Sequence, residues 1–232
     1  MKNQKNLTEI CKKVCLLLPT YKQICTPAYQ SMISFISSLY KNGHEVAVVM
    51  VDKCNVVSAR NQLATEAYHL EQTDGADVYA WIDSDHTFTY EDFATLAYHR
   101  HASGAQILSA KNFSRNADPK ACAYVKKDGG YIPIPPDLDT PVQEVDAVGF
   151  GFLLVTGDVI RTMYEKHGPR QFMIRFADWD TTDLVSEDIA WCELAAEAGY
   201  KICVDNLVVP GHYGAIIDNR FVEKFINSIK ES

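Results

Sequence analysis

Two aspartates, Asp83 and Asp85, stand one residue apart directly after the apolar run 79–82. Residues two apart in an extended segment point the same way, so both carboxylates could converge on one cation. Mg²⁺ and Mn²⁺ prefer oxygen ligands and commonly bind one or two carboxylates together with substrate phosphates. An isolated Asp-Ser-Asp more often caps a helix or faces solvent. Here the buried strand expected before it favours a cation, because two acids at its end repel each other unless they are compensated.

A second acidic pair, Glu187 and Asp188, follows Ser186 at the expected start of a helix. Serine caps helices and acids in the first turn complement the helix dipole, which is a sufficient structural explanation. The catalytic alternative is that a carboxylate held rigidly by this helix accepts the proton of an attacking hydroxyl group. The sequence alone leaves both explanations open.

Alternating strand and helix patterns in the first half indicate how these acids are positioned. Apolar strands are expected at 14–18, 44–52 and 78–82, and helices are expected to begin near Thr26, Ser58 and Thr89. Such alternation predicts a parallel sheet with helices on both faces. Ligands bind such sheets at the carboxyl ends of the strands, where Asp83 and Asp85 are expected. In the second half, shorter strands are expected at 105–110, 121–125, 148–155 and 201–205. Two helices are expected to begin near 158 and 186.

Composition restricts the possible functions. The chain has 232 residues, a net charge of -8 and a pI near 5.3, which argues against nucleic acid as a partner, because such binding depends on Lys and Arg. Seven cysteines without metal-binding spacing indicate a reducing compartment. No run approaches the about 18 apolar residues of a transmembrane segment. We expect a cytoplasmic protein, for which a position at a membrane surface stays open. If the protein binds an anion, we expect a metal to supply the positive charge.

The order of the segments LLLPTY, SARNQLA, YAWIDSD, VGFGFLLV, SEDIAWCELAAEAGYKI and VVPGHYG resembles GT-A fold nucleotide-sugar glycosyltransferases of the family two type. The resemblance implies an α/β fold with a Rossmann-like, mostly parallel central sheet, helices on both faces and a smaller mixed acceptor-side half. It implies one domain, with a nucleotide-binding half at 12–104, an acceptor and catalytic half at 105–215 and a C-terminal helix at 216–232.

The resemblance also implies an activity: metal-dependent transfer of a hexosyl or related sugar, with inversion. The donor would be a nucleoside-diphosphate sugar, most often a UDP- or GDP-sugar, and the acceptor a hydroxyl of a glycan or another molecule. The cofactor would be Mn²⁺ or Mg²⁺.

Residue roles follow from the same resemblance. Nucleotide contacts are implied for Pro19, Thr20, Tyr21, Asp52, Arg60, Asp83 and Ser84. Metal ligation is implied for Asp85, Asp83 and His212. Asp188 would be the general base, with Glu187 as the second choice or as an acceptor-binding residue. The residues themselves suggest a donor and acceptor pocket: Gly149, Phe150 and Gly151 could form the floor under the donor sugar, since glycine allows close backbone approach, and a bulge is equally compatible. An acceptor sugar could stack on Trp179, although a core position is more common for tryptophan.

One departure bears on the nucleoside contacts. The segment Asp52-Lys53-Cys54-Asn55 stands where many relatives have an Asp-Asp-Gly-Ser type turn.

Two other functions stay open at this point. A nucleotidyltransferase also uses acids and a metal, but no glycine-rich loop with a lysine follows the first strand. A non-catalytic domain that binds nucleotide-sugars or carbohydrate would carry the same pocket.

Overall fold

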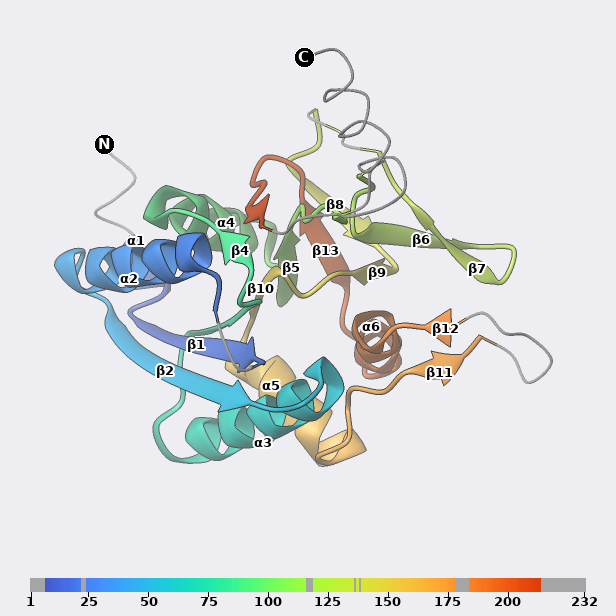
Figure 1. Cartoon of the computed structure of the whole chain (residues 1–232), viewed down its shortest axis with the longest axis horizontal. Helices are drawn as coiled ribbons and strands as arrows, with labels where there is room; N and C mark the ends of the chain where they lie inside the picture. The colour runs from blue at the N-terminus through green and yellow to red at the C-terminus, as the bar shows by residue number, and fades with distance from the viewer. Residues whose placement is uncertain are drawn as a thin grey trace, which may run out of the picture.

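The computed structural model describes residues 7–21, 24–115, 119–135, 137, 139–177 and 184–213. Within these residues, the centre of the molecule is a seven-stranded sheet with the order β2-β1-β3-β10-β5-β13-β8 (Figure 1). Its strands are β1 (Lys13–Thr20), β2 (Glu45–Asp52), β3 (Val78–Ile82), β5 (Ile107–Ala110), β8 (Val142–Val145), β10 (Phe152–Val155) and β13 (Ile202–Asp205). Only β10 and β8 run opposite to the other five, which confirms a mostly parallel sheet.

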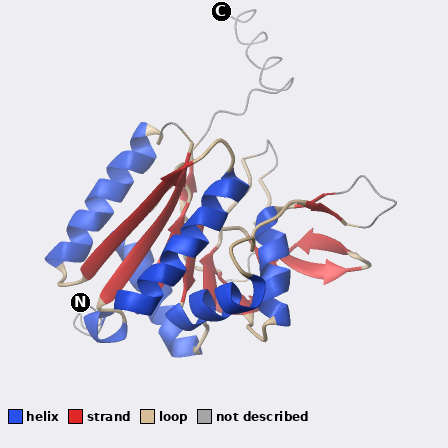
Figure 2. Ribbon diagram, turned by 90° about the horizontal axis from the view of Figure 1, so that it is seen from below, coloured by secondary structure: helices blue, strands red, loops and turns tan. Residues whose placement is uncertain are grey.

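Helices cover both faces of this sheet (Figure 2). They are α1 (Leu7–Ile10), α2 (Thr26–Lys41), α3 (Val56–Asp74), α4 (Tyr90–Ser103), α5 (Gly157–His167) and α6 (Glu187–Glu197). Buried side chains of α1, α2 and α4 form one core layer, and those of α3, α5 and α6 form the other. No helix in the described part of the chain is long and apolar enough to cross a membrane.

The helix starts follow local chemistry, with two corrections. Thr89 and Asp92 form the expected capping box, in which each side chain accepts from the backbone N–H of the other. Helix α3, however, begins at Val56 and its cap is Asn55, whose side chain accepts from the Ser58 N–H at 2.8 Å. Asparagine is as good a cap as serine, and it lies three residues earlier. Likewise α2 follows Cys25, which makes no side-chain cap bond, instead of being capped by Thr26.

The predicted strand 148–155 is two strands. Ala147–Val148 forms β9, which pairs with β6 (Ala123–Lys127), whereas Phe152–Val155 forms β10 of the central sheet. The chain turns between them at 149–151. This turn carries Gly149 and Gly151 beneath the candidate site.

Short strands complete the structure. They are β4 (His86–Thr87), β7 (Gly130–Pro133), β11 (Arg175–Phe176), β12 (Leu184–Val185) and β14 (Gly211–His212). The antiparallel pair β4 and β14 places His212 opposite His86, although 126 positions separate them in the sequence. This pairing brings the end of the described chain to the loop after β3. Trp179 and the expected helix 216–232 lie outside the described residues.

Candidate active site

A cavity of about 550 Å³ lies where β1 and β3 end and α3 and α6 begin. Its lining is Pro19, Thr20, Tyr21, Val56, Ala59, Arg60, Asp83, Ser84, Asp85, Arg115, Glu187, Asp188 and His212. The structure therefore brings together most of the residues predicted as a site. Arg60 lies in the second turn of α3 and Glu187 is the first residue of α6; the two are 127 residues apart in the chain, and both line this cavity.

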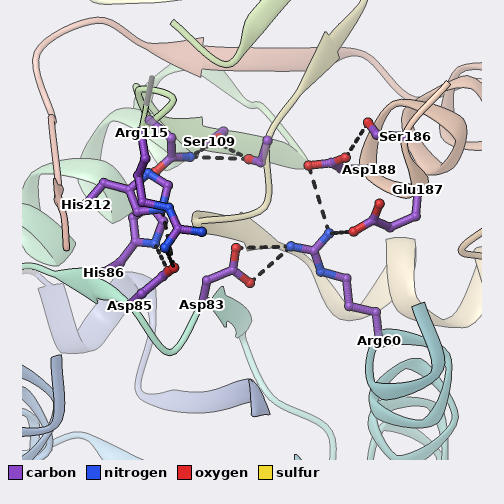
Figure 3. Close-up of polar contacts among 12 residues, drawn as sticks. Arg60, Asp83, Asp85, His86, Ser109, Arg115, Ser186, Glu187, Asp188 and His212 are labelled. Atoms are coloured by element: carbon purple, nitrogen blue, oxygen red, sulfur yellow. Dashed lines mark hydrogen bonds and ion pairs between the residues drawn. The ribbon is translucent and has the colours of Figure 1, made fainter. Parts of the chain in front are cut away.

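Arg60 is the centre of an ion cluster on one side of the cavity (Figure 3). Its Nη2 atom donates to both oxygens of Asp83, at 3.0 and 3.1 Å, and its Nη1 atom donates to Oε1 of Glu187 at 2.9 Å. The Arg60 side chain is only 4% exposed, and its guanidinium carbon lies 5.1 Å from the centre of the Phe150 ring. Burial alone would lower the pKa of Arg60, but the neighbouring carboxylates outweigh burial and raise it.

The two acids at the start of α6 differ in their surroundings. Glu187 is bound to Arg60, and burial raises the pKa of its carboxyl group despite that partner. Asp188 lies farther from Arg60, with Oδ2 at 3.9 Å from Nη1, and its Oδ1 accepts from the hydroxyl of Ser186 at 2.6 Å. Ser186 is the N-cap of α6, but its hydroxyl binds this carboxylate instead of capping the helix backbone. Asp188 is thus a held carboxylate with an oxygen that faces the cavity.

Asp85 belongs to a second cluster on the opposite side of the cavity. Its Oδ1 lies 3.0 Å from Nδ1 of His86, and its Oδ2 lies 3.0 Å from Nη1 of Arg115 and 3.4 Å from Nε2 of His212. The two histidine rings are stacked, with centroids 4.2 Å apart. Burial would raise the pKa of Asp85, but hydrogen bonds from His212 and His86 outweigh it and hold the pKa well below its usual range. Burial would lower the pKa of His212, but the hydrogen bond to Asp85 outweighs burial and raises that pKa.

This second cluster fits a divalent cation. Asp85, His86 and His212 each offer a donor atom within 4.8 Å of the others. The Nδ1 atom of His212 lies 2.7 Å from the Phe113 carbonyl oxygen, to which it can only donate, so Nε2 is directed at Asp85. A metal-binding histidine typically has this arrangement, with its second nitrogen bonded to a carbonyl. The 3.4 Å between Nε2 and Oδ2 suits two donors that each lie about 2.0–2.2 Å from one ion.

The remaining predicted residues lie outside the cavity lining. Asp52 ends β2, the edge strand of the central sheet. Phe150 is buried in the core, against Trp81, and supports Arg60 from below. Gly149 lies beside the site, since a Cβ atom there would be 3.8 Å from Oδ2 of Asp188. At Gly151 a Cβ atom would lie 2.3 Å from Nε2 of His86, so only glycine fits that position.

Sequence reasoning had not placed Arg115 or His86 in the site. The contact of Arg115 with Asp85 depends on a loop that no local pattern indicates. His86 is 2% exposed and binds Asp85. Its position directly after the Asp-Ser-Asp segment was the available signal.

No protein-family model and no curated protein matches the sequence. Among solved structures, the chain is similar to GalNAc-T7 determined with UDP, GalNAc and Mn²⁺, with a TM-score of 0.58 and 10% identity over 89% of this chain. The fold is that of a GT-A glycosyltransferase. This chain covers 44% of the GalNAc-T7 chain, so it spans less than half of that protein. It is also similar to A197 from STIV, with a TM-score of 0.54 and 15% identity over 88% of this chain and 86% of that one. The predicted fold class is confirmed.

Proposed function

We propose that this chain is a metal-dependent glycosyltransferase that moves a sugar from a nucleoside-diphosphate sugar to an acceptor hydroxyl. One observation carries the proposal: a single cavity holds a pair of metal-ligand type, Asp85 and His212, and a separate carboxylate, Asp188, across from it. The GT-A fold, shared with a protein determined with UDP and Mn²⁺, supports the same activity.

Asp85 and His212 would hold the metal, with Mn²⁺ or Mg²⁺ as the ion. When bound, such an ion acts as a Lewis acid that stabilises negative charge on a departing diphosphate. Asp83 is a weaker candidate for a ligand, because both of its oxygens accept from Arg60. Its role in this proposal is to hold Arg60, while Asp85 faces the ion.

The nucleoside would lie at the end of β1. Pro19, Thr20 and Tyr21 line the cavity there, and Ser84 lines it between the two aspartates. The exposed ring of Tyr21 offers an aromatic surface for a base. Asp52 ends the neighbouring strand β2, and we assign it to the ribose or the base. UDP- and GDP-sugars are the proposed donors.

Asp188 would act as the general base. A base must reach the acceptor hydroxyl and be free to take its proton. Glu187 is bound to Arg60 and nearly buried, whereas Asp188 keeps one oxygen toward the cavity while Ser186 orients the other. A base on the face opposite the departing diphosphate gives a single displacement, so we propose inversion at the sugar.

We also propose a cytoplasmic location, because all seven cysteines are free thiols.

The test begins with nucleotide binding. Thermal unfolding is measured with UDP, GDP, dTDP and CMP, each with Mn²⁺ and with EDTA. A ligand at about 100 times its Kd adds about 2.7 kcal/mol to the free energy of unfolding, which is visible as a raised Tm. We expect one diphosphate to stabilise the protein with Mn²⁺ only. No shift with any nucleotide would refute the proposed nucleotide site.

Product analysis then separates the activities. Nucleotide-sugars that carry the stabilising nucleotide are incubated with the protein and Mn²⁺, and the phosphate-containing products are identified. Release of the nucleoside diphosphate supports sugar transfer, whereas pyrophosphate would indicate nucleotidyl transfer. Metal-dependent binding without release over a broad acceptor panel would indicate a binding domain instead.

A further inference from the structure

Arg115 binds the same carboxylate oxygen that the proposed metal would use. Its Nη1 atom lies 3.0 Å from Oδ2 of Asp85, and Nε2 of His212 lies 3.4 Å from that same oxygen (Figure 3). The Arg115 side chain is 49% exposed, whereas that of Asp85 is 27% exposed. The Arg115 guanidinium therefore lies on the carboxylate oxygen that the proposed metal would use.

A divalent ion on Asp85 and His212 would displace Arg115. The ion and the guanidinium would share one oxygen atom, so two permanent positive charges would stand within a few ångströms of each other and repel. The guanidinium has no lone pair with which to bind the ion, and it cannot lose its charge in the physiological range. Since the side chain is half exposed, it can turn away without unfolding any packed element.

The backbone around Arg115 keeps the displaced side chain at the edge of the cavity. Phe113 forms an antiparallel bridge with Ala121, and the Ser114 N–H donates to the Lys120 carbonyl oxygen at 2.8 Å. The Lys120 N–H donates in turn to Oγ of Ser114 at 3.0 Å. These bonds fix the backbone of Ser114, the residue next to Arg115, at the edge of the cavity.

The two arginines of the described cavity lining differ in what they can still bind. Arg60 is 4% exposed and already donates to Asp83 and Glu187. Among the residues that the structure describes, Arg115 binds one carboxylate, that of Asp85, and the metal would take this partner. A guanidinium binds phosphate oxygens through two parallel hydrogen bonds, and a diphosphate next to the metal offers such oxygens.

We propose that Arg115 is a diphosphate-binding residue that occupies Asp85 until the metal arrives and then moves to the donor diphosphate. The inference rests on the proposed function, because it requires a metal at Asp85 and a diphosphate in the cavity. It predicts that Arg115 opposes binding of the free metal and favours binding of the nucleotide once the metal is present. A residue with only a structural role would not change the two affinities in opposite directions.

The experiment measures both affinities in four proteins: wild type, Arg115→Met, Arg115→Lys and Arg161→Met. Free Mn²⁺ is titrated without nucleotide by electron paramagnetic resonance, and UDP and GDP are titrated by calorimetry at saturating Mn²⁺. Arg161 is the matched control, because it is a comparably exposed arginine that pairs with Asp158 on α5.

We expect Arg115→Met to bind Mn²⁺ about two- to fivefold more tightly, since a partly exposed ion pair no longer competes. We expect the same variant to bind the preferred nucleotide at least about tenfold more weakly, since a charge-assisted hydrogen bond is lost. Arg115→Lys should bind Mn²⁺ like wild type and the nucleotide with intermediate affinity. Arg161→Met should match wild type in both titrations.

The possible failures are distinguishable. If wild type binds Mn²⁺ and nucleotide but Arg115→Met leaves either affinity unchanged, or changes both in the same direction, this inference is wrong and the proposed function stands. If neither wild type nor Arg115→Met binds Mn²⁺, the metal site itself is wrong and both proposals fail. If Arg115→Met binds Mn²⁺ and wild type does not, the result would directly support competition between Arg115 and the metal for Asp85.

Discussion

Nη2 of Arg60 lies 3.0 Å from Oδ1 and 3.1 Å from Oδ2 of Asp83, so one nitrogen of a buried guanidinium is shared by both oxygens of a single carboxylate. The other terminal nitrogen binds Glu187. Arg60 comes from α3, Asp83 follows β3, and Glu187 begins α6. One side chain thereby joins three elements that meet at the cavity.

Replacing Arg60 by Met should destabilise the protein by about 3 kcal/mol, because two carboxylates would lose their compensating charge in a mostly buried place. Breaking a buried ion pair typically costs about 3–5 kcal/mol, and we expect the low end of this range because the Asp83 side chain is 26% exposed. Urea unfolding at pH 7 measures the change. The double variant Arg60→Met/Glu187→Gln should recover part of the loss, since it removes one of the unpaired charges. A loss below about 1 kcal/mol in the single variant would contradict the central role of this cluster.

His44 should make stability depend on pH. It is 3% exposed, with Nδ1 at 2.8 Å from the Cys11 carbonyl oxygen and Nε2 at 3.1 Å from the Tyr90 hydroxyl, and burial lowers its pKa. The unfolded state therefore binds a proton more readily, so stability is fully present above about pH 6.5 and falls as the pH drops below that value. Burial raises the pKa of both the Cys11 thiol and the Tyr90 hydroxyl to about 12, so neither titrates in this range.

The measurement is urea unfolding of wild type and His44→Gln between pH 5 and pH 8. The amide of Gln can still accept from Tyr90 but cannot be protonated. The difference in unfolding free energy between the two proteins should therefore shrink as the pH falls from 6.5 to 5. A difference that stays constant with pH would show that His44 does not contribute to the pH dependence.

Local patterns were sufficient to predict most elements of this fold. The buried strand 78–82 and the capping box at Thr89 and Asp92 depend on residues close together in sequence, so composition and spacing reveal them. Asp83 and Asp85 were predicted at the cavity for the same reason, because the end of a buried parallel strand has a known place in such a sheet.

Long-range pairing could not be predicted in this way. Arg60 and Glu187 are 127 residues apart, and their contact depends on the packing of α3 and α6 at the same end of the sheet. The pairing of β4 with β14, which brings His212 to His86, is equally remote in sequence. The interruption at 149–151 was missed because a glycine-flanked apolar run is compatible with one strand or two.

Gly151→Ala should damage the fold near the proposed metal site. The added Cβ atom would lie 2.3 Å from Nε2 of His86 and 2.8 Å from Oδ1 of Asn112, and both side chains are buried. Overpacking of this kind costs about 1–3 kcal/mol, and here it would push His86 away from Asp85. We expect a lowered Tm together with weaker Mn²⁺ binding, measured by unfolding and by titration.

Gly149→Ala is the control for this variant. Its Cβ atom would come no closer than 3.0 Å, to the Cβ atom of Cys122, and it lies on the Asp188 side of the turn. Its effect on Mn²⁺ binding should be smaller than that of Gly151→Ala. Equal loss of Mn²⁺ binding in both variants would indicate that the turn matters as a whole and that His86 has no special place in the site.

Asp188→Asn should separate catalysis from binding. The amide keeps the size of the side chain but cannot accept a proton, so the proposed transfer rate should fall by about 10²–10⁴-fold. The Kd of the nucleotide with Mn²⁺ should stay near the wild-type value, because Asp85 and His212 are unchanged. Ser186→Ala should give a smaller loss of rate, since it removes only the hydroxyl that donates to Oδ1 of Asp188 at 2.6 Å.

Glu187→Gln tests the other acid of the pair. Because Glu187 binds Arg60 and is nearly buried, we expect its replacement to lower stability more than Asp188→Asn does and to leave a larger residual rate. Initial rates at saturating donor, compared at a temperature where each variant is folded, separate the two effects. If Glu187→Gln lost the rate and Asp188→Asn kept it, the base would be Glu187, and Arg60 would then be the residue that controls its proton affinity.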